Sequence, residues 1–229
     1  MTATDVPAKA EKTDTAPRNS RSDGNATYAR ILETAGELFA AQGFAQTPNK
    51  AIAAAAQVDL ASINYHFGNR DGLYQAVLIE AHSRIISLMD LQQLADSPLP
   101  PAEKLRLILH AVIQKALNNQ GWHTAIIAQA ITQHAQTLRL LDGEMLPKSQ
   151  LLKKILSDIS GIDENDPALL PCVLSIIAPL LTLFLFGKNM PAPLLGLQNQ
   201  SPEAIAETLH RYAVAGLAGV GGFNGFEIK

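Results

Sequence analysis

The hydrophobic and polar residues near the start of the chain repeat with the period of an α-helix. Apolar side chains recur at positions i, i+1, i+4, i+7 and i+8, which places them on one face of a helix. Gly43 follows the last of these positions, as is common where a helix ends. We therefore expect a helix from Tyr28 to Gln42, with an apolar face made of Ile31, Leu32, Ala35, Leu38 and Phe39.

Two short helices are expected next, separated by only a few residues. Thr47 and Pro48 are residue types that favour an N-cap and a first helical position, and they precede the segment NKAIAAAAQ. That helix should end near Gln57, because Asp59 is a good N-cap for the following segment, LASINYHF. Two short helices joined by so tight a turn predict a helix-turn-helix.

A much longer helix should follow the helix-turn-helix. Gly68 and Asn69 are suited to ending the second short helix and capping the next one. Apolar residues then keep helical spacing until the pattern breaks at DSPLPP, near Ala95. The residues that define this face are Leu73, Val77, Ala81, Ile85 and Leu88.

The rest of the chain also predicts helices. We expect them at about 101–118, 122–136 and 138–160, with a long apolar helix from Asp166–Pro167, a loop over MPAPLLGLQNQ and a last helix from Ser201–Pro202. The fold class is therefore all-α. The expected organisation is a disordered arm (1–25), a three-helix helix-turn-helix domain (26–75), a larger helical domain (76–220) and a flexible tail (221–229).

One apolar segment raises the question of a membrane. Leu169 to Gly187 is nineteen residues without a charge, which reaches the length of a bilayer-spanning helix. Against a membrane stand two prolines, Pro171 and Pro179, and the acidic residues just before the segment. A helix that is apolar on all faces also suits the interior of a soluble bundle or dimer. We favour this second interpretation and expect no membrane contact.

Composition limits the classes of function. The formal net charge is −3 and the isoelectric point is about 6.1, so nothing in the overall charge indicates nucleic-acid binding. Any such role must come from the local placement of a few residues. The single cysteine, Cys172, excludes an intramolecular disulfide and suits a reducing compartment. The first residues lack the apolar core of a signal peptide, so we expect a cytoplasmic protein.

A polar cluster lies on the second helix of the helix-turn-helix. In this motif the second helix enters the major groove of DNA, and its side chains reach the base edges. Ser62 and Asn64 could contact bases, the Asn amide being suited to adenine. The alternative is a solvated helix face, but the capped helix and tight turn before the cluster favour DNA. The expected phosphate contacts are Tyr65, His66, Thr47, Lys50 and Arg70.

These motifs carry a resemblance to a known family. Residues 31–77, ILETAGELFAAQGFAQTPNKAIAAAAQVDLASINYHFGNRDGLYQAV, resemble the N-terminal domain of the TetR family of bacterial transcriptional regulators. Residues 122–159 are similar to the CecR-like (CerR) C-terminal domain of one branch. The resemblance implies a groove helix over Leu60, Ala61, Ser62, Asn64, Tyr65 and His66, a cap at Thr47 and a phosphate contact at Arg70.

The chain departs from the family pattern at the turn. Gln57 stands where a glycine is usual, so we expect a left-handed backbone there at a cost of about 1 kcal/mol. Asp59 replaces a common serine, and Pro48 replaces a frequent threonine. Between Ala26 and Gln75 three basic and four acidic residues give a net charge of −1. Few phosphates can be neutralised, so the salt dependence of DNA binding should be shallow.

The resemblance also implies partners. It implies a homodimer that binds double-stranded operator DNA, usually as a repressor that a small molecule releases. The last two helices, about 166–187 and 201–220, are the expected dimer interface, because one is apolar all round and the other is rich in small residues. The effector cavity is expected between the helices at 101–187. Its candidates are Trp122, His123, Gln129, Gln133 and Phe184. For each of them a structural role is favoured over ligand binding: a core position for Trp122 and Phe184, and a capping or surface position for His123.

Other functions remain open. The histidines at 110, 123 and 134 lack a partner four residues away, and Cys172 lacks a second thiol, so we expect no metal, no cofactor and no catalytic centre. One alternative is an activator or architectural DNA binder with the same helix-turn-helix and no effector. The other is a helical protein that binds a small molecule or a membrane.

Overall fold

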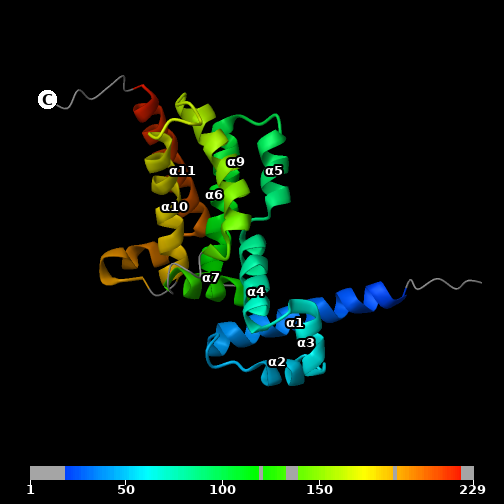
Figure 1. Ribbon diagram of the computed structural model, residues 1–229. Helices are drawn as coiled ribbons and strands as arrows, with labels where there is room; N and C mark the ends of the chain where they lie inside the picture. Colours follow the sequence, from blue (N-terminus) through cyan, green and yellow to red (C-terminus); the bar gives the residue numbers. More distant parts are fainter. Residues whose placement is uncertain (1–18, 119–120, 133–138, 188–189, 223–229) are drawn as a thin grey trace, which may run out of the picture.

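The computed structural model describes residues 19–118, 121–132, 139–187 and 190–222. Within these residues it contains ten α-helices, one 3-10 helix and no strand, so the expected all-α fold is confirmed. Figure 1 shows an upright bundle of helices standing on a smaller group of three. The small group is α1 (Asn19–Gln42), α2 (Asn49–Ala55) and α3 (Leu60–Phe67).

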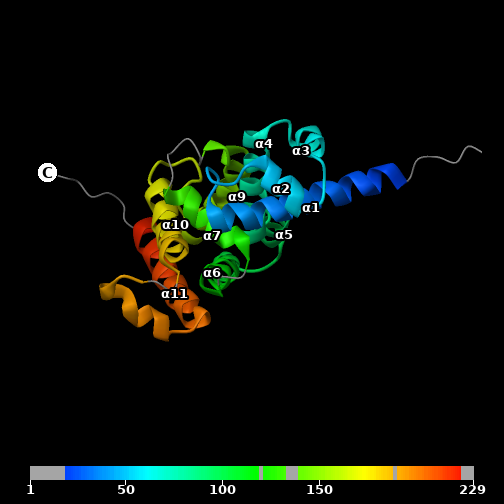
Figure 2. The same cartoon turned by 90° about the horizontal axis from the view of Figure 1, so that it is seen from below.

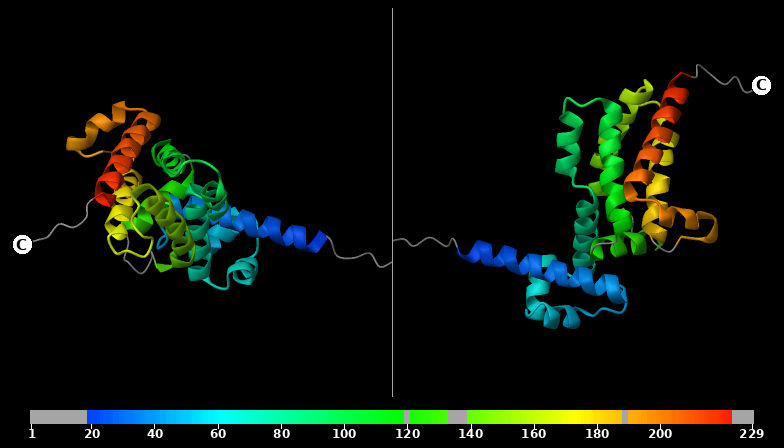
Figure 3. Two further views of the ribbon diagram at one scale, coloured as in Figure 1. Left: turned by 90° about the horizontal axis from the view of Figure 1, so that it is seen from above. Right: turned by 180° about the vertical axis from the view of Figure 1, so that it is seen from behind.

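Helix α1 is longer than its apolar pattern indicates. It begins at Asn19, inside the expected disordered arm, so the boundary at residue 25 is wrong; residues 1–18 lie outside the described part. Extending a packed helix adds one hydrogen bond per residue without a new nucleation cost, which allows polar turns to continue it. In Figure 3 these first turns project away from the rest of the protein.

The turn of the helix-turn-helix has the expected geometry. Gln57 has φ of +54°, the left-handed conformation predicted from the missing glycine. Asp59 caps α3, and its carboxylate accepts the Ser62 N–H at 2.6 Å. Asn69 caps α4 (Arg70–Ile85) by accepting the Gly72 N–H at 2.8 Å. These short-range predictions are confirmed.

The start of α2 differs from the prediction. Its N-cap is Pro48, which makes no side-chain capping bond. Thr47 is fully buried, and its hydroxyl donates to the Gly43 carbonyl at 2.9 Å. Because Thr47 thus joins the core beneath the loop after α1, it neither caps α2 nor faces solvent.

The long fourth helix is divided in two. Helix α4 ends at Ile85, Ile86 is extended, and α5 spans Leu88–Asp96. Ser87 starts the new helix by accepting the Asp90 N–H at 3.0 Å. The expected continuous helix to Ala95 is therefore wrong, because a local serine cap competes with helix continuation at this point.

The larger group of helices stands above α1. Helices α6, α9, α10 and α11 form the bundle, with α5 beside α9, and α7 lies between the bundle and α1 (Figures 1 and 2). The expected loop before the last helix is partly a 3-10 helix, and α7 ends at Thr132, next to residues outside the described part. The bounds are α6 Pro101–Asn118, α7 Trp122–Thr132, α9 Asp142–Ser160, α10 Leu169–Phe186, η1 Ala192–Asn199 and α11 Pro202–Gly221.

Helix α4 joins the two groups through one hydrophobic core. It contacts α1 and α3 below and α7, α6 and α9 above. Its apolar residues face both groups, so the core continues from the helix-turn-helix into the bundle without a gap. A displacement of α4 must therefore reach both groups. The buried residues of α4 are Leu73, Tyr74, Val77, Leu78, Ala81 and Ile85.

Helix α4 is also tied to α9 by a buried charge. Lys148 is 5% exposed, with its Nζ 3.1 Å from His82 Nδ1 and 3.0 Å from a Glu144 carboxylate oxygen. Burial, and then the charge of Lys148, lower the pKa of His82 to about 4 from the usual 6.5. The imidazole is therefore neutral at pH 7 and accepts from the lysine.

This arrangement predicts a loss of stability in mild acid. Below pH 6.5 the unfolded chain takes up a proton on His82 that the folded chain refuses until about pH 4. The free energy of unfolding should fall across this window by up to about 3 kcal/mol from this group. Urea unfolding of wild type and His82→Gln at several pH values measures it. Equal pH slopes for the two proteins would contradict the prediction.

Candidate nucleic-acid interface

The outward face of α3 is formed by residues three and four positions apart. Ile63 is buried in the core, whereas Ala61, Asn64 and Tyr65 are exposed on one side of the helix. Tyr65 is 85% exposed, which is unusual for a large aromatic side chain. An exposed tyrosine beside an exposed amide is typical of a surface that contacts another molecule. Leu60, at the start of α3, is also exposed.

Two aromatic contacts hold the end of α3 against α1. Tyr28 stacks on Phe67 with ring centroids 4.6 Å apart, and its ring lies edge-on to His66 at 6.0 Å. His66 is therefore half-buried between α1 and solvent, at the edge of the α3 surface. From the sequence, Tyr28 was expected only to begin the helix. An aromatic residue one turn before the first apolar position of the helix was the sequence feature that could have indicated this packing.

Asp59 occupies the donors of Ser62. Both the Ser62 hydroxyl and its N–H donate to the same carboxylate oxygen at 2.6 Å. These two hydrogen bonds lower the pKa of Asp59, so its negative charge persists at neutral pH. Ser62 can then contact a base only through the free lone pairs of its oxygen, as an acceptor. Asn64 retains both an amide donor and an acceptor for base recognition.

Arg70 fixes the loop between α1 and α2. Its Nη2 donates to the carbonyls of Phe44 and Thr47, the latter at 3.0 Å. The guanidinium also lies over the Phe44 ring, 4.4 Å from the centroid. The expected phosphate contact at the fully buried Thr47 is therefore corrected to a structural role, whereas a phosphate contact at the half-buried Arg70 stays a prediction. Lys50, in the first turn of α2, is exposed as a phosphate contact requires.

The four effector candidates that the structure describes line none of the three cavities along α10, α11 and η1. Trp122 is buried, and its indole N–H donates to Glu33 at 2.9 Å. Gln129 donates to the Ala40 carbonyl at 3.0 Å, so both residues connect α7 to α1. Phe184 is a core residue of α10. His123 is partly buried, and burial followed by the nearby arginine and lysine lowers its pKa; Gln133 lies outside the described residues.

Three cavities lie along α10, α11 and η1. The effector cavity was expected between the helices at 101–187, so the involvement of η1 and α11 differs from the prediction. Their volumes are about 250, 280 and 240 Å³. The first is floored by Leu109 of α6 and opens between α10 and α11. The third shares Pro179 and Leu209 with the first, and Met190 and Leu197 with the second. The three cavities therefore lie next to one another in a row, and most of the residues that line them are apolar.

An exposed apolar stripe follows the same two helices. Leu170, Leu174, Leu181 and Leu185 recur on one side of α10, and Tyr212 of α11 is 75% exposed. Among the described residues α10 is also the one helix with the length and composition of a membrane span, and 28% of it is buried inside the chain. A continuous row of exposed leucines along one helix is typical of a site that contacts another protein or a membrane.

Comparison with known protein families identifies both parts of the chain. The profile of bacterial regulatory proteins of the tetR family matches residues 31–77. The profile of the C-terminal domain of the HTH-type transcriptional dual regulator CecR matches residues 101–220, more than half of the chain. No curated protein sequence matches the chain.

Solved structures share the fold at low sequence identity. FadR from Bacillus subtilis in complex with stearoyl-CoA has a TM-score of 0.66 at 17% identity, covering 82% of this chain and 98% of that one. AibR in complex with isovaleryl coenzyme A and operator DNA gives 0.60 at 21%, covering 81% and 97%. A TetR-like regulator from Rhodococcus sp. RHA1 gives 0.59 at 20%, covering 84% and 96%. The chain belongs to the TetR family of transcriptional regulators and carries a CecR-like C-terminal domain.

Proposed function

We propose that this protein is a homodimeric, ligand-responsive repressor that binds a palindromic operator in the cytoplasm. The observation that carries the proposal is the α3 surface, where Ala61, Asn64 and Tyr65 face solvent above a capped turn. In a helix-turn-helix this surface enters the major groove, with Asn64 against a base and Tyr65 and His66 against the backbone. Lys50 and the free N–H groups at the start of α2 add phosphate contacts.

The dimer is proposed to form through α10 and α11. Their exposed leucines, with Tyr212, form an apolar stripe that a single chain leaves in water. Gly216 and Gly219 of α11 are exposed with open space around them, so a partner helix can approach closely. Two such pairs make a four-helix bundle around a two-fold axis. In such a dimer the two α3 helices would lie about 34 to 36 Å apart, which is the separation of successive major grooves on one face of DNA.

The effector is proposed to carry an aliphatic chain. The second and third cavities, which Tyr212 and Gly216 of the proposed dimer interface do not line, have mostly apolar walls, with amide side chains such as Asn118 and Gln200 in the second. FadR and AibR, which share the fold, are described in complex with acyl-coenzyme A molecules. A fatty-acyl thioester or a related amphiphile fits this combination of an apolar row and a polar end.

The test measures operator binding in the presence of acyl ligands. The purified dimer should bind DNA from upstream of its own gene, and one acyl-CoA from a series of increasing chain length should lower its affinity at least about tenfold. Coenzyme A without an acyl group is the control. Binding that is unaffected by every member of the series would exclude this effector class. Absence of any DNA binding at low salt would exclude the whole proposal.

Activation is a second candidate, because the matching C-terminal profile is named for a dual regulator. A reporter under the bound promoter separates the two roles. Deleting the regulator should raise reporter expression if it represses. A fall on deletion would establish activation at that promoter.

A further inference from the structure

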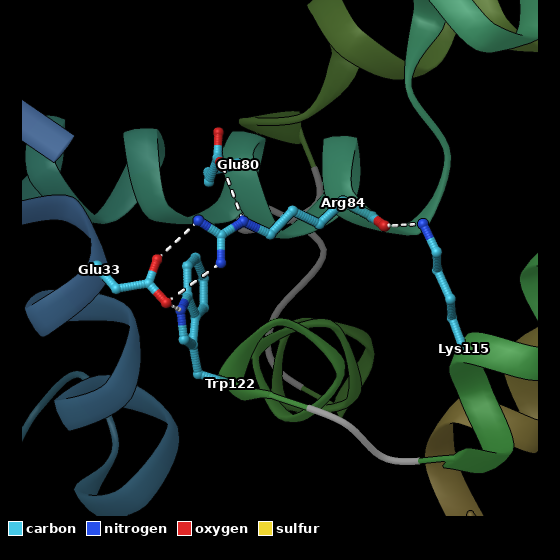
Figure 4. Close-up of polar contacts among 5 residues, drawn as sticks. All are labelled: Glu33, Glu80, Arg84, Lys115 and Trp122. Atoms are coloured by element: carbon cyan, nitrogen blue, oxygen red, sulfur yellow. Dashed lines mark hydrogen bonds and ion pairs between the residues drawn. The ribbon is translucent and has the colours of Figure 1, made fainter.

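A polar cluster at the junction of α1, α4 and α7 is not explained by DNA contact or by the cavities. Its centre is the Glu33 carboxylate on α1 (Figure 4). Arg84 Nη2 on α4 donates to one carboxylate oxygen at 2.7 Å, and the Trp122 indole N–H on α7 donates to the other at 2.9 Å. One side chain of the DNA-binding group of helices is thus held by two side chains from the helices above it.

Arg84 has further contacts that fix its position. Its Nε donates to Glu80 at 2.8 Å, and its guanidinium lies over the Trp122 ring, 4.9 Å from the centroid. These bonds raise the pKa of Arg84 and lower that of Glu33, chiefly through the hydrogen bond between them. Arg84 is the residue before the last one of α4, just ahead of the extended Ile86. A movement of this end of α4 therefore displaces the Arg84 guanidinium relative to Glu33 on α1.

A glycine on α1 supports a specific role for the indole. A Cβ at Gly36 would overlap three carbons of the Trp122 ring. Glycine inside a helix lowers helix stability, so its presence in the middle of α1 needs a local reason. The reason here is the direct contact of the ring with the α1 backbone. The position of Trp122 on α1 is consequently set by shape as well as by the hydrogen bond to Glu33.

The cluster is connected to the row of cavities through α6. The ammonium group of Lys115 on α6 donates to the main-chain carbonyl of Arg84. Leu117 and Asn118, at the end of the same helix, line the second cavity. A ligand that shifts the end of α6 thus acts on Arg84 through one lysine, and on Glu33 and α1 through Arg84. Figure 4 shows this order of contacts from Lys115 to Glu33.

The exposure of the ion pair argues against a mainly stabilising role. Arg84 and Glu33 are 38% and 44% exposed, and pairs of this kind contribute little to the free energy of folding. A bidentate arginine over an aromatic ring does, however, define the relative orientation of the helices that carry it. Orientation matters for this family, because the two α3 helices must meet grooves at a fixed separation.

We propose that Glu33, Arg84 and Trp122 are positioning residues that hold α1 at the angle required for operator binding, and that the Arg84–Glu33 contact opens in the effector-bound state. The expected effect on operator binding rests on the proposed regulatory function. The position of α1 relative to α4 and α7 can be measured without DNA. The effector shifts the population towards the open state only by its higher affinity for that state.

The test compares two arginine variants of the full-length dimer. Arg84→Met keeps the aliphatic stem and removes the guanidinium. Arg106→Met is the matched control, because Arg106 pairs with Glu103 within α6 at 2.5 Å and has similar exposure. Operator affinity should fall about tenfold in Arg84→Met and stay unchanged in Arg106→Met. Melting temperatures should differ from wild type by less than about 3 °C in both.

Two measurements on the free protein separate this proposal from the regulatory function. Trp122 is the only tryptophan, so its emission should move to longer wavelength in Arg84→Met alone. Spin labels at Glu37→Cys, in a Cys172→Ser background, should give one narrow distance across the dimer in the parent and a broader distribution with Arg84→Met. An unchanged distribution overturns the positioning role. If Arg84→Met changes the emission and the spin-label distances but the wild-type protein binds no operator, the positioning role stands and the regulatory function is rejected.

Discussion

Replacing Asn64 by alanine is expected to lower operator affinity at least about tenfold while the dimer stays intact. Asn64 is exposed on the outward face of α3, and its amide offers a donor and an acceptor in one plane. Such an amide can pair with adenine through two hydrogen bonds, a contact worth about 1 to 3 kcal/mol of base discrimination. A dimer makes the contact twice, so the loss applies to both half-sites.

Fluorescence anisotropy with a labelled operator duplex measures this loss. Gln93→Ala, an exposed amide on α5 far from the helix-turn-helix, is the matched control and should bind as wild type does. The Asn64 variant should also lose discrimination at one base pair in each half-site. Unchanged affinity and unchanged base preference in Asn64→Ala would remove this residue from the interface.

Leu174→Glu is expected to convert the protein into a monomer that no longer binds the operator at micromolar concentration. Leu174 is 63% exposed in the single chain and lies in the middle of the apolar stripe of α10. In the proposed four-helix interface the variant would bury two unpaired carboxylates, at a cost of several kcal/mol each. Because each protomer's α3 contacts one groove and tight binding needs both half-sites, loss of the dimer removes the second half-site contact.

Sedimentation velocity at several protein concentrations measures the association state. The control is Leu195→Glu, which places the same charge on an exposed leucine of η1, outside the proposed interface. The control should remain dimeric and bind DNA. A dimeric Leu174→Glu protein would show that the interface lies elsewhere on the surface.

Local interactions explain what could be predicted from the sequence. The caps at Asp59 and Asn69 join residues three positions apart, and the left-handed Gln57 was expected from the family resemblance, which places a glycine at this turn position. Interactions between residues so close in the sequence can be recognised from a short segment, so the helix-turn-helix could be located. The α3 surface followed from the same local pattern, although contact with DNA at those residues stays a prediction.

Long-range contacts explain what could not be predicted. Arg70 bonds to a carbonyl 26 residues earlier in the chain, and Glu33 bonds to side chains 51 and 89 residues later. Residue type and the family resemblance suggested a phosphate contact for Arg70, and Trp122 was a candidate effector residue for which a core position was favoured. Neither pattern contains the distant partners that these side chains bind. Gly36, unusual inside a helix, was the one local sign of the junction between α1 and α7.

In the proposed complex, two copies of α3 recognise one symmetric DNA site. Selection of bound duplexes from a random pool, followed by sequencing, tests it most directly. The selected duplexes should be enriched in an inverted repeat whose half-sites are centred about one helical turn apart. Recovery of no preferred sequence, or of a single site without two-fold symmetry, would contradict it.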